Sequence, residues 1–358
     1  AYSITMLSND AERLIRLQEA RDSIEKALAL SPDDSTIRAI YAFVLDWYAS
    51  SPLVSEEERQ NLLLEAESDA VRAYGLEPEN GLALAYYAEV LLDQQKWSQA
   101  EQNAAKAVSI SPDSMDAHRV YGTVLESLGQ YNSAIKQYLS ATEINPNLTF
   151  LYVYIGRNYL SLKLYDQALE YFANAAAINR QLGVNNPIPN IEIAKTYAQQ
   201  GEFFIAARNA ESALAYDPTN ANTYGQLGII YIRSRNYEGA MPVLQCAVLG
   251  CSAEENEIGG APVEGLDLTN LTVAYYYVEY GTVLAFLSRP NQNYCSQAQP
   301  VLNQVRATYP DDPILMSIVE DSEGICRQLG SPTSEGPATT SEPVPTPSPD
   351  NIDSSMSG

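Results

Sequence analysis

Four basic residues lie on one face of four successive expected helices and could together hold carboxylates. They are Arg119, Arg157, Lys195 and Arg233, and they represent four of only 21 bases in a chain with 45 acids. Guanidinium and ammonium groups form charge-assisted hydrogen bonds to carboxylates, so such a row could bind an acidic peptide. The alternative is that these bases are solvated and pair with acids of the chain itself, such as Glu192 beside Lys195.

Motifs of enzymes and metalloproteins are absent from the sequence. It has no GxSxG, phosphate-binding loop or HExxH motif, and no serine or cysteine is indicated as a nucleophile beside its one histidine, His118. We therefore expect a protein that is not an enzyme and that needs no cofactor and no metal. The net charge of −24 argues against nucleic acid as a partner. No apolar run is long enough to form a transmembrane segment.

An internal repeat supplies the elements that position the basic row. Five times, a small residue is followed twelve positions later by alanine, in the pairs Ala88 and Ala100, Gly122 and Ala134, Gly156 and Ala168, Ala194 and Ala206, Gly228 and Ala240. Apolar residues at helical spacing surround both members of each pair, which predicts two amphipathic helices per unit. The small residues let the two helices approach closely.

The repeat resembles the tetratricopeptide repeat family. The most complete unit carries Tyr121, Gly122, Leu125, Gly129, Tyr131, Ala134, Tyr138, Ala141 and Pro146. The resemblance covers roughly residues 1–330. It implies an all-α fold, a right-handed superhelical solenoid of antiparallel helix pairs with about seven units and a capping helix.

The resemblance and the composition divide the chain into five segments. We expect an atypical N-terminal unit or cap in residues 1–34, the repeat array in 35–249, an acidic loop insertion in 250–271, a last repeat-like unit with the capping helix in 272–330, and a tail in 331–358. The tail is rich in Ser, Thr and Pro and cannot bury enough apolar surface to fold, so we expect it to be disordered.

The resemblance also implies a binding groove on the concave face, lined by the first helix of each unit, where the family binds extended peptides. The groove positions that we single out are Arg119, Phe150, Val153, Arg157, Asn158, Ile191, Lys195, Ile229 and Arg233. Arg157, Asn158 and Lys195 are the nearest equivalents of the family's carboxylate clamp, although the full pattern is not reproduced. The apolar positions either contact a partner, the insertion or a second copy, or they belong to the core.

Four cysteines occur in the last third of the chain. In stacked helical pairs, Cys295 and Cys326 come within bridging distance, and Cys246 and Cys251 flank a helix end where a tight loop could join them. Two disulfides would indicate an oxidising compartment, and four separate buried thiols are the alternative. Export would make two possible glycosylation sites relevant, at Asn147 and Asn270.

These observations favour a non-enzymatic interaction scaffold, exported or surface-attached, that binds a peptide or partner protein. A second hypothesis is a subunit that assembles into an extracellular fibre or surface array. It draws on the acids Asp46, Glu89, Asp93 and Asp116, which lie toward the N-terminal end of the groove, whereas the bases lie toward its C-terminal half. A third is a cytoplasmic adaptor with reduced cysteines.

Overall fold

The computed structural model describes residues 10–51 and 53–330, and the predicted tail lies outside this range. The described residues form sixteen α-helices. They are α1 (Asp10–Leu30), α2 (Ser35–Ala49), α3 (Glu56–Leu76), α4 (Gly81–Asp93), α5 (Trp97–Ile110), α6 (Met115–Ser127), α7 (Tyr131–Ile144), α8 (Thr149–Ser161), α9 (Tyr165–Leu182), α10 (Ile188–Gln199), α11 (Phe203–Leu214), α12 (Ala221–Arg233), α13 (Tyr237–Val248), α14 (Leu271–Leu287), α15 (Cys295–Thr308) and α16 (Pro313–Gly330).

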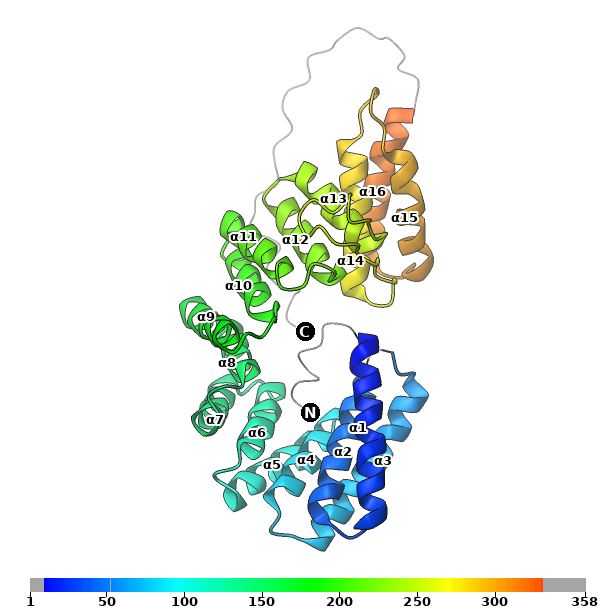
Figure 1. Ribbon diagram of the computed structural model, residues 1–358. Helices are drawn as coiled ribbons and strands as arrows, with labels where there is room; N and C mark the ends of the chain where they lie inside the picture. The colour runs from blue at the N-terminus through cyan, green and yellow to red at the C-terminus, as the bar shows by residue number, and fades with distance from the viewer. Residues whose placement is uncertain (1–9, 52, 331–358) are drawn as a thin grey trace.

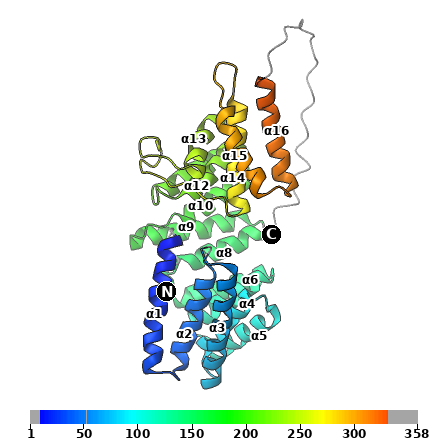
Figure 2. The ribbon, with the colours of Figure 1, turned by 90° about the vertical axis from the view of Figure 1, so that its right-hand side faces the viewer.

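The helices pack as seven consecutive antiparallel pairs, from α2 with α3 to α14 with α15. Helix α1 precedes the pairs and contacts α2, and α16 follows them and contacts α14 and α15. The pairs stack into an arc with the N-terminal half at one end and the C-terminal half at the other (Figures 1 and 2). The predicted all-α solenoid with a capping helix is therefore confirmed.

Small residues at the helix crossings allow each pair to pack closely. A Cβ atom added to Gly122 of α6 would lie 2.6 Å from the ring of Tyr138 of α7, and one added to Gly156 would collide with Phe172. Both aromatic side chains are fully buried. The same relation joins two further glycines to leucines, in the pairs Gly228 with Leu244 and Gly281 with Leu302. The sequence signature of the repeat is thus a steric requirement of the crossing.

A left-handed residue reverses the chain between the two helices of five pairs. The five residues and their φ angles are Gln95 (60°), Gly129 (71°), Lys163 (59°), Gly201 (81°) and Arg235 (62°). Only two of them are glycine, the residue that adopts positive φ without a steric cost. The turn geometry is therefore kept even where the residue type does not favour it, because the packing of the helices on both sides requires it.

The insertion is a fixed loop rather than an extended one. Cys251 and Val263 exchange backbone hydrogen bonds of 3.0 and 2.9 Å. Asn256 is buried, and its Oδ1 accepts a hydrogen bond of 2.9 Å from the hydroxyl of Tyr224 in α12. The hydroxyl of Tyr277 in α14 donates to the carbonyl of Leu266 at 2.7 Å. These contacts hold the insertion against the last two helix pairs.

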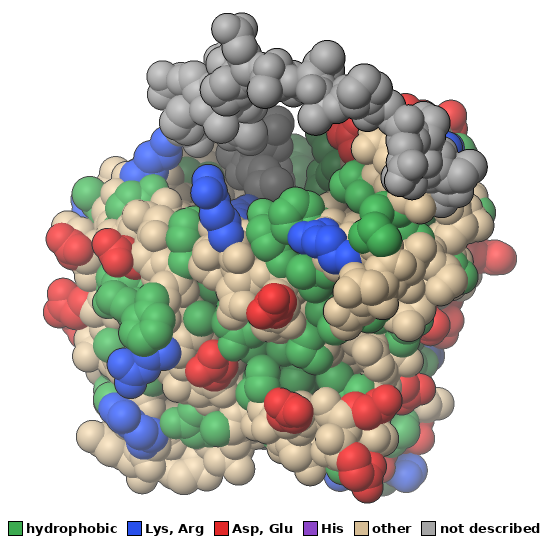
Figure 3. All heavy atoms as spheres, turned by 90° about the horizontal axis from the view of Figure 1, so that it is seen from above, with side chains coloured by type: hydrophobic (Ala, Val, Ile, Leu, Met, Phe, Trp, Pro, Cys, Tyr) green, Lys and Arg blue, Asp and Glu red, His purple; other side chains and the backbone are tan. Residues whose placement is uncertain are grey.

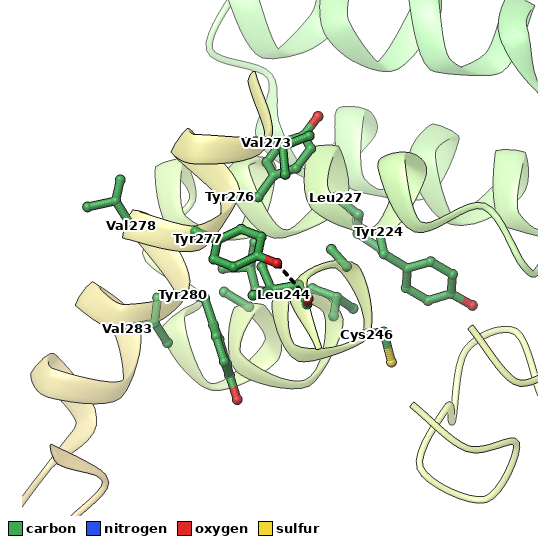
Figure 4. Close-up of a cluster of buried hydrophobic side chains, with 14 of the residues drawn as sticks. Tyr224, Leu227, Leu244, Cys246, Val273, Tyr276, Tyr277, Val278, Tyr280 and Val283 are labelled. Carbon is green, nitrogen blue, oxygen red and sulfur yellow. Dashed lines mark hydrogen bonds between the residues drawn. The ribbon is translucent and has the colours of Figure 1, made fainter. Parts of the chain in front are cut away.

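Tyrosine fills much of the core beside the insertion. Tyr224 and Tyr280 are almost fully buried, and Tyr276 and Tyr277 are nearly so. Figure 4 shows Tyr224 on α12 and the other three on α14, with the Tyr277 ring directed toward Leu244 of α13 and the Tyr224 and Tyr280 rings directed away from it. The Tyr276 ring fills the space that Gly225 leaves open, since a Cβ atom added there would lie 2.5 Å from the ring. The buried tyrosines are therefore packing residues.

Both predicted cysteine pairs lie at disulfide distance. Cys295 at the start of α15 and Cys326 in α16 have Cα atoms 5.6 Å apart, and Cys246 and Cys251 have Cα atoms 4.8 Å apart. No free cysteine is found in the described part of the chain. One bridge thus fastens the capping helix to the last pair, and the other closes the first turn of the insertion.

Replacing Gly122 by alanine tests the crossing. We expect Gly122→Ala to destabilise the protein by about 1–3 kcal/mol, because the new methyl group overlaps the Tyr138 ring inside a packed core. Gly75 in α3 is the matched control: nothing lies within 4 Å of a Cβ added there, so Gly75→Ala should stabilise by about 0.5–1 kcal/mol. Thermal denaturation followed by circular dichroism measures both, and equal effects would contradict the steric account.

Replacing Cys295 and Cys326 by serine tests the C-terminal bridge. The bridge closes a loop of 31 residues, for which chain entropy predicts a loss of about 3–4 kcal/mol in the variant. Because repeat stability is local, hydrogen exchange should accelerate mainly in α16 and less in α4–α7. Alkylation of the native protein without reductant should modify none of the four cysteines, and any modified cysteine would contradict the pairing.

Candidate partner-binding surface

The first helix of each pair lies on the inner side of the arc. Helices α8 and α10 face its open centre in Figure 1, whereas α7 and α9 lie outside. The even-numbered helices also contact one another along the stack, α2 with α4, α4 with α6 and α14 with α16. We use the name concave surface for the side chains that α2, α4, α6, α8, α10 and α12 direct away from their own pairs on the inner side of the arc.

The first base of the predicted row is not available on that surface. Arg119 exposes only 3 % of its side chain. Its two terminal nitrogens donate to the two carboxylate oxygens of Glu89, each at 2.7 Å, and Asp116 lies 3.5 Å away. The expectation that Arg119 is a groove residue free to bind a partner is wrong, because a neighbouring repeat already supplies its carboxylate.

Two other bases of the row share one buried carboxylate. Glu192 accepts a hydrogen bond of 2.8 Å from Arg157 and one of 3.4 Å from Lys195. Burial alone would raise the pKa of Glu192, but the positive charges of Lys195 and Arg157 hold it below its ordinary value. The two basic side chains still expose 42 % and 43 % of their surface. They remain accessible, but with one negative charge already between them.

The fourth base, Arg233, is exposed at the end of α12. Its charge acts on Glu279 of the next first helix, whose pKa is raised by burial and partly restored by Arg233. The four bases thus all face carboxylates of the chain. The row that the sequence predicts as a carboxylate site is largely a set of contacts between neighbouring repeats.

The remaining predicted groove positions divide into core and surface. Val153 and Asn158 expose 3 % and 1 %, so the expectation that they face a groove is wrong. Val153 packs in the core with Phe172, and the Asn158 amide donates to Glu126 and to its own helix. Phe150, Ile191 and Ile229 are half-buried. The sequence pattern alone could not separate these cases, because a change of one position along a helix turns a side chain by about 100°.

His118 has a structural role. Its side chain is buried, with Nδ1 2.7 Å from Oε1 of Gln137 and Nε2 2.8 Å from the carbonyl oxygen of Pro112. Both ring nitrogens are therefore used to join α6 to neighbouring segments, as expected for a histidine that does no chemistry.

The N-terminal part of the concave surface carries a cluster of carboxylates that we call the acidic recess. It consists of Asp46 on α2, Glu89 and Asp93 on α4, and Asp116 with the base Arg119 on α6. Burial, and after it the charges of Asp93 and Glu89, raise the pKa of Asp46 well above its ordinary value. Partial desolvation and Glu89 raise the pKa of Asp93 to about 6.

The sequence contains a signal for this recess that the repeat comparison could have used. Glu89 follows the small residue Ala88 by one position, as Arg157 follows Gly156 and Lys195 follows Ala194. One slot of the repeat thus holds an acid in α4 and a base in α8 and α10. The sequence predicts only a difference in charge between the two ends of the groove, whereas the burial of Asp46 is a property of the fold.

The surface beyond the recess is mixed. Figure 3 shows the molecule from above the C-terminal half, with acidic and basic side chains interspersed among hydrophobic ones. Within residues 10–51 and 53–330, no group of three or more His, Cys, Asp or Glu residues could hold a metal ion. In the same part of the chain, no helix is both long and apolar enough to cross a membrane.

The fold defines the class: a helical-repeat protein built of stacked antiparallel helix pairs. Residues 88–148 match the tetratricopeptide repeat family model, and the pairs on both sides repeat the same architecture. Over these residues the chain is similar to the tetratricopeptide repeat family. Among curated proteins, none matches its sequence.

Solved structures of the same fold extend over most of the chain. The Cut9–Hcn1 hetero-tetramer of the APC/C matches with a TM-score of 0.57 and 16 % identity over 89 % of this chain and 54 % of that one. Yeast Tom70 matches with a TM-score of 0.56 and 13 % identity over 89 % of this chain and 60 % of that one. A tetratricopeptide repeat protein from Parabacteroides merdae matches with a TM-score of 0.51 and 15 % identity over 74 % of this chain and 93 % of that one. The chain thus spans little more than half the length of the first of these, and at such identities the likeness shows the fold alone.

Neutralising Asp46 should stabilise the protein. A carboxyl group whose folded pKa is raised contributes stability below its unfolded pKa, and this contribution is lost as the pH rises through the folded pKa. At pH 7 the recess therefore opposes folding, and Asp46→Asn should raise the free energy of unfolding.

The increase in the free energy of unfolding caused by Asp46→Asn should be smaller at pH 5, where the acids of the recess are closer to their protonated forms. Melting temperatures of the wild type and of Asp46→Asn at both pH values measure this. Glu57→Gln, in the exposed first turn of α3, is the control and should change neither value. A fall in stability at pH 7 for Asp46→Asn would show that the Asp46 carboxylate is instead held by favourable contacts.

Proposed function

We propose that the protein is a non-enzymatic scaffold whose concave surface binds a segment of a partner protein. The observation that carries the proposal is the surface itself: first helices from successive repeats present half-buried apolar side chains, such as Ile191 and Ile229, next to charged ones. A long surface with apolar and charged positions in alternation suits an extended or helical segment. In one structural relative, a chain of this fold is part of a hetero-tetramer, which agrees with such a role.

The charge of the partner follows from the inner surface. A purely acidic partner is not favoured, because Arg119 is buried in a pair with Glu89, and Arg157 and Lys195 already contact Glu192. A partner with both charges fits better: acidic groups near Arg157 and Lys195, and basic groups toward α2 and α4.

Action outside the cytoplasm is the second part of the proposal. The four cysteines pair as two disulfides, which persist in oxidising compartments and are rare in the cytosol. Asn147 is exposed between α7 and α8, although Thr149 of its sequon is buried, and Asn270 is exposed while its Oδ1 caps α14. The alkylation measurement described above tests this part as well, since free thiols in the native protein would point to a reducing compartment.

Self-assembly into a fibre is supported less well. Helix α16 has no following partner helix in the described chain, and its exposed side chains are mainly polar, including Ser317, Glu320, Asp321 and Gln328. A polar outer face is what terminal repeats use to end an array in water. The scaffold is therefore our conclusion.

A matched pair of variants tests the concave surface. Peptides selected from a random displayed library of 12 residues would be assayed against Ile191→Glu in α10 and Ile205→Glu in α11, the two helices of one pair. Ile191 is half-buried on the inner helix, and Ile205 is 39 % exposed on the outer one. We expect Ile191→Glu to weaken the selected peptides at least about tenfold, the effect of about 1.4 kcal/mol.

Ile205→Glu should leave binding unchanged, and circular dichroism would verify that both variants keep the wild-type helix content. Peptides that lose binding equally to both variants, or only to Ile205→Glu, would place the binding surface elsewhere and contradict the proposal. Failure to select any peptide that depends on Ile191 would count against it in the same way.

A further inference from the structure

The acidic recess determines what chemistry the concave surface recognises at its N-terminal end, an inference that rests on the proposed function. We propose that the recess between α2 and α4 binds the ammonium or guanidinium group of a lysine or arginine side chain of the partner segment. The groups that would receive it are the carboxylates of Asp46 and Asp93. Glu89, already paired with Arg119, forms the adjoining wall.

The charges in the recess are out of balance. The four carboxylates of Asp46, Glu89, Asp93 and Asp116 are opposed by two guanidinium groups: Arg119 acts on Asp46, Glu89 and Asp116, and Arg59 of α3 acts on Asp93. Glu89 uses both its oxygens on Arg119, and Asp116 lies beside the same group. Within the described chain neither Asp46 nor Asp93 has an ion pair. The recess therefore carries an excess of negative charge that one more cation would reduce.

The carboxylate of Asp46 is buried without a hydrogen bond to one of its oxygens. Asp46 is 1 % exposed, and its Oδ1 has no partner. A buried carboxylate in that state is costly, because its lost hydration is not replaced. Asp93 lies closer to the surface and accepts a hydrogen bond of 3.2 Å from Ser50. The two carboxylates act on one another electrostatically, so a cation bound at Asp93 would also stabilise the charge of Asp46.

The walls of the recess already bind one guanidinium. The Arg119 group lies over the ring of Phe43 at 5.6 Å from its centroid, and Phe43 stacks on Tyr86 with centroids 4.4 Å apart. Trp47 donates from its indole nitrogen to Glu89 at 3.4 Å. Carboxylates next to aromatic faces are the surroundings that cationic side chains prefer. The pair of Arg119 with Glu89 shows that a guanidinium can bind a carboxylate beside these rings. Asp46 and Asp93 are further carboxylates nearby that have no such base.

An apolar cavity beside the recess can take the rest of such a segment. It has a volume of about 250 Å³ between α1 and α2 and is lined mainly by apolar side chains, among them Leu17, Ile40, Val44 and Trp47. Trp47 borders both the cavity and the recess. The pair of sites fits a basic residue with an apolar residue near it in the partner's sequence.

Binding of a cation should depend on pH in a defined direction. The charges that face Asp46 and Asp93 come from Glu89 on the same helix as Asp93, from Arg119 on α6 and from Arg59 on α3. A cation is attracted only to ionised carboxylates, so affinity should fall as the pH is lowered from 7 through about 6, where Asp93 takes up a proton.

The first test uses a small cation directly. Nα-acetyl-lysine methylamide is titrated into the full chain at physiological salt, with Nα-acetyl-norleucine methylamide as the uncharged probe of similar length. The carboxyl carbons of Asp46 and Asp93 are followed by NMR. We expect both signals to shift with the lysine probe and not with the norleucine probe, at pH 7 and much less at pH 5.

Asp46→Asn and Asp93→Asn should each abolish most of the response of the remaining carboxyl carbon, whereas Glu57→Gln should not. Equal shifts with both probes, or no shift with the lysine probe, would overturn the inference. An equal loss in Glu57→Gln would show diffuse attraction to the net negative surface and would overturn it as well.

The selected peptides separate this inference from the proposed function. We expect the peptides that require Ile191 to be enriched in lysine or arginine. Replacement of that base by norleucine or citrulline should lower the affinity at least about tenfold. This reduction should occur only in protein in which Asp46 and Asp93 are intact. Peptides that require Ile191 but carry no such base would overturn the cation site and leave the scaffold standing. Peptides whose affinity does not depend on Ile191 would contradict the proposed scaffold function, whatever the lysine probe shows.

Discussion

The close crossing of the two helices in each pair is the constraint on which the structure depends. Gly122, Gly156, Gly228 and Gly281 leave the space that an aromatic ring or a leucine from the second helix fills. A larger residue would push the helices apart, and the angle between successive pairs would change with it. The curvature of the arc, and hence the existence of a concave surface, follows from a contact made well away from that surface.

The periodic part of the fold could be predicted from the sequence because the close crossing restricts which residue types can occur at the crossing positions. Small residues and alanines at fixed spacing predicted five of the seven helix pairs, and the position of Cys295 and Cys326 within the repeat predicted their pairing. The same logic failed for Arg119, Val153 and Asn158. Whether a residue near the edge of a buried face is exposed depends on the neighbouring repeat, and periodicity within one repeat carries no information about it.

Charges between repeats explain why the basic row is a poor guide to ligands. In a stack of first helices, a base on one helix lies beside an acid of a neighbouring first helix, as Arg157 does with Glu192 of the next one and Arg119 with Glu89 of the preceding one. Such pairs fix the register of neighbouring repeats. A recognition site is better sought where this pairing is incomplete, and in the described part of the chain Asp46 is a buried example.

The two disulfides give the array two unlike ends. Both lie beyond residue 245, one in the loop after α13 and one between α15 and α16. Each repeat contacts only its neighbours, so a cross-link does not strengthen distant units. The solenoid therefore has an anchored end and an open end, and the open end holds the recess and the apolar cavity beside α1. A local loss of structure in the N-terminal repeats therefore need not extend to the cross-linked repeats at the other end.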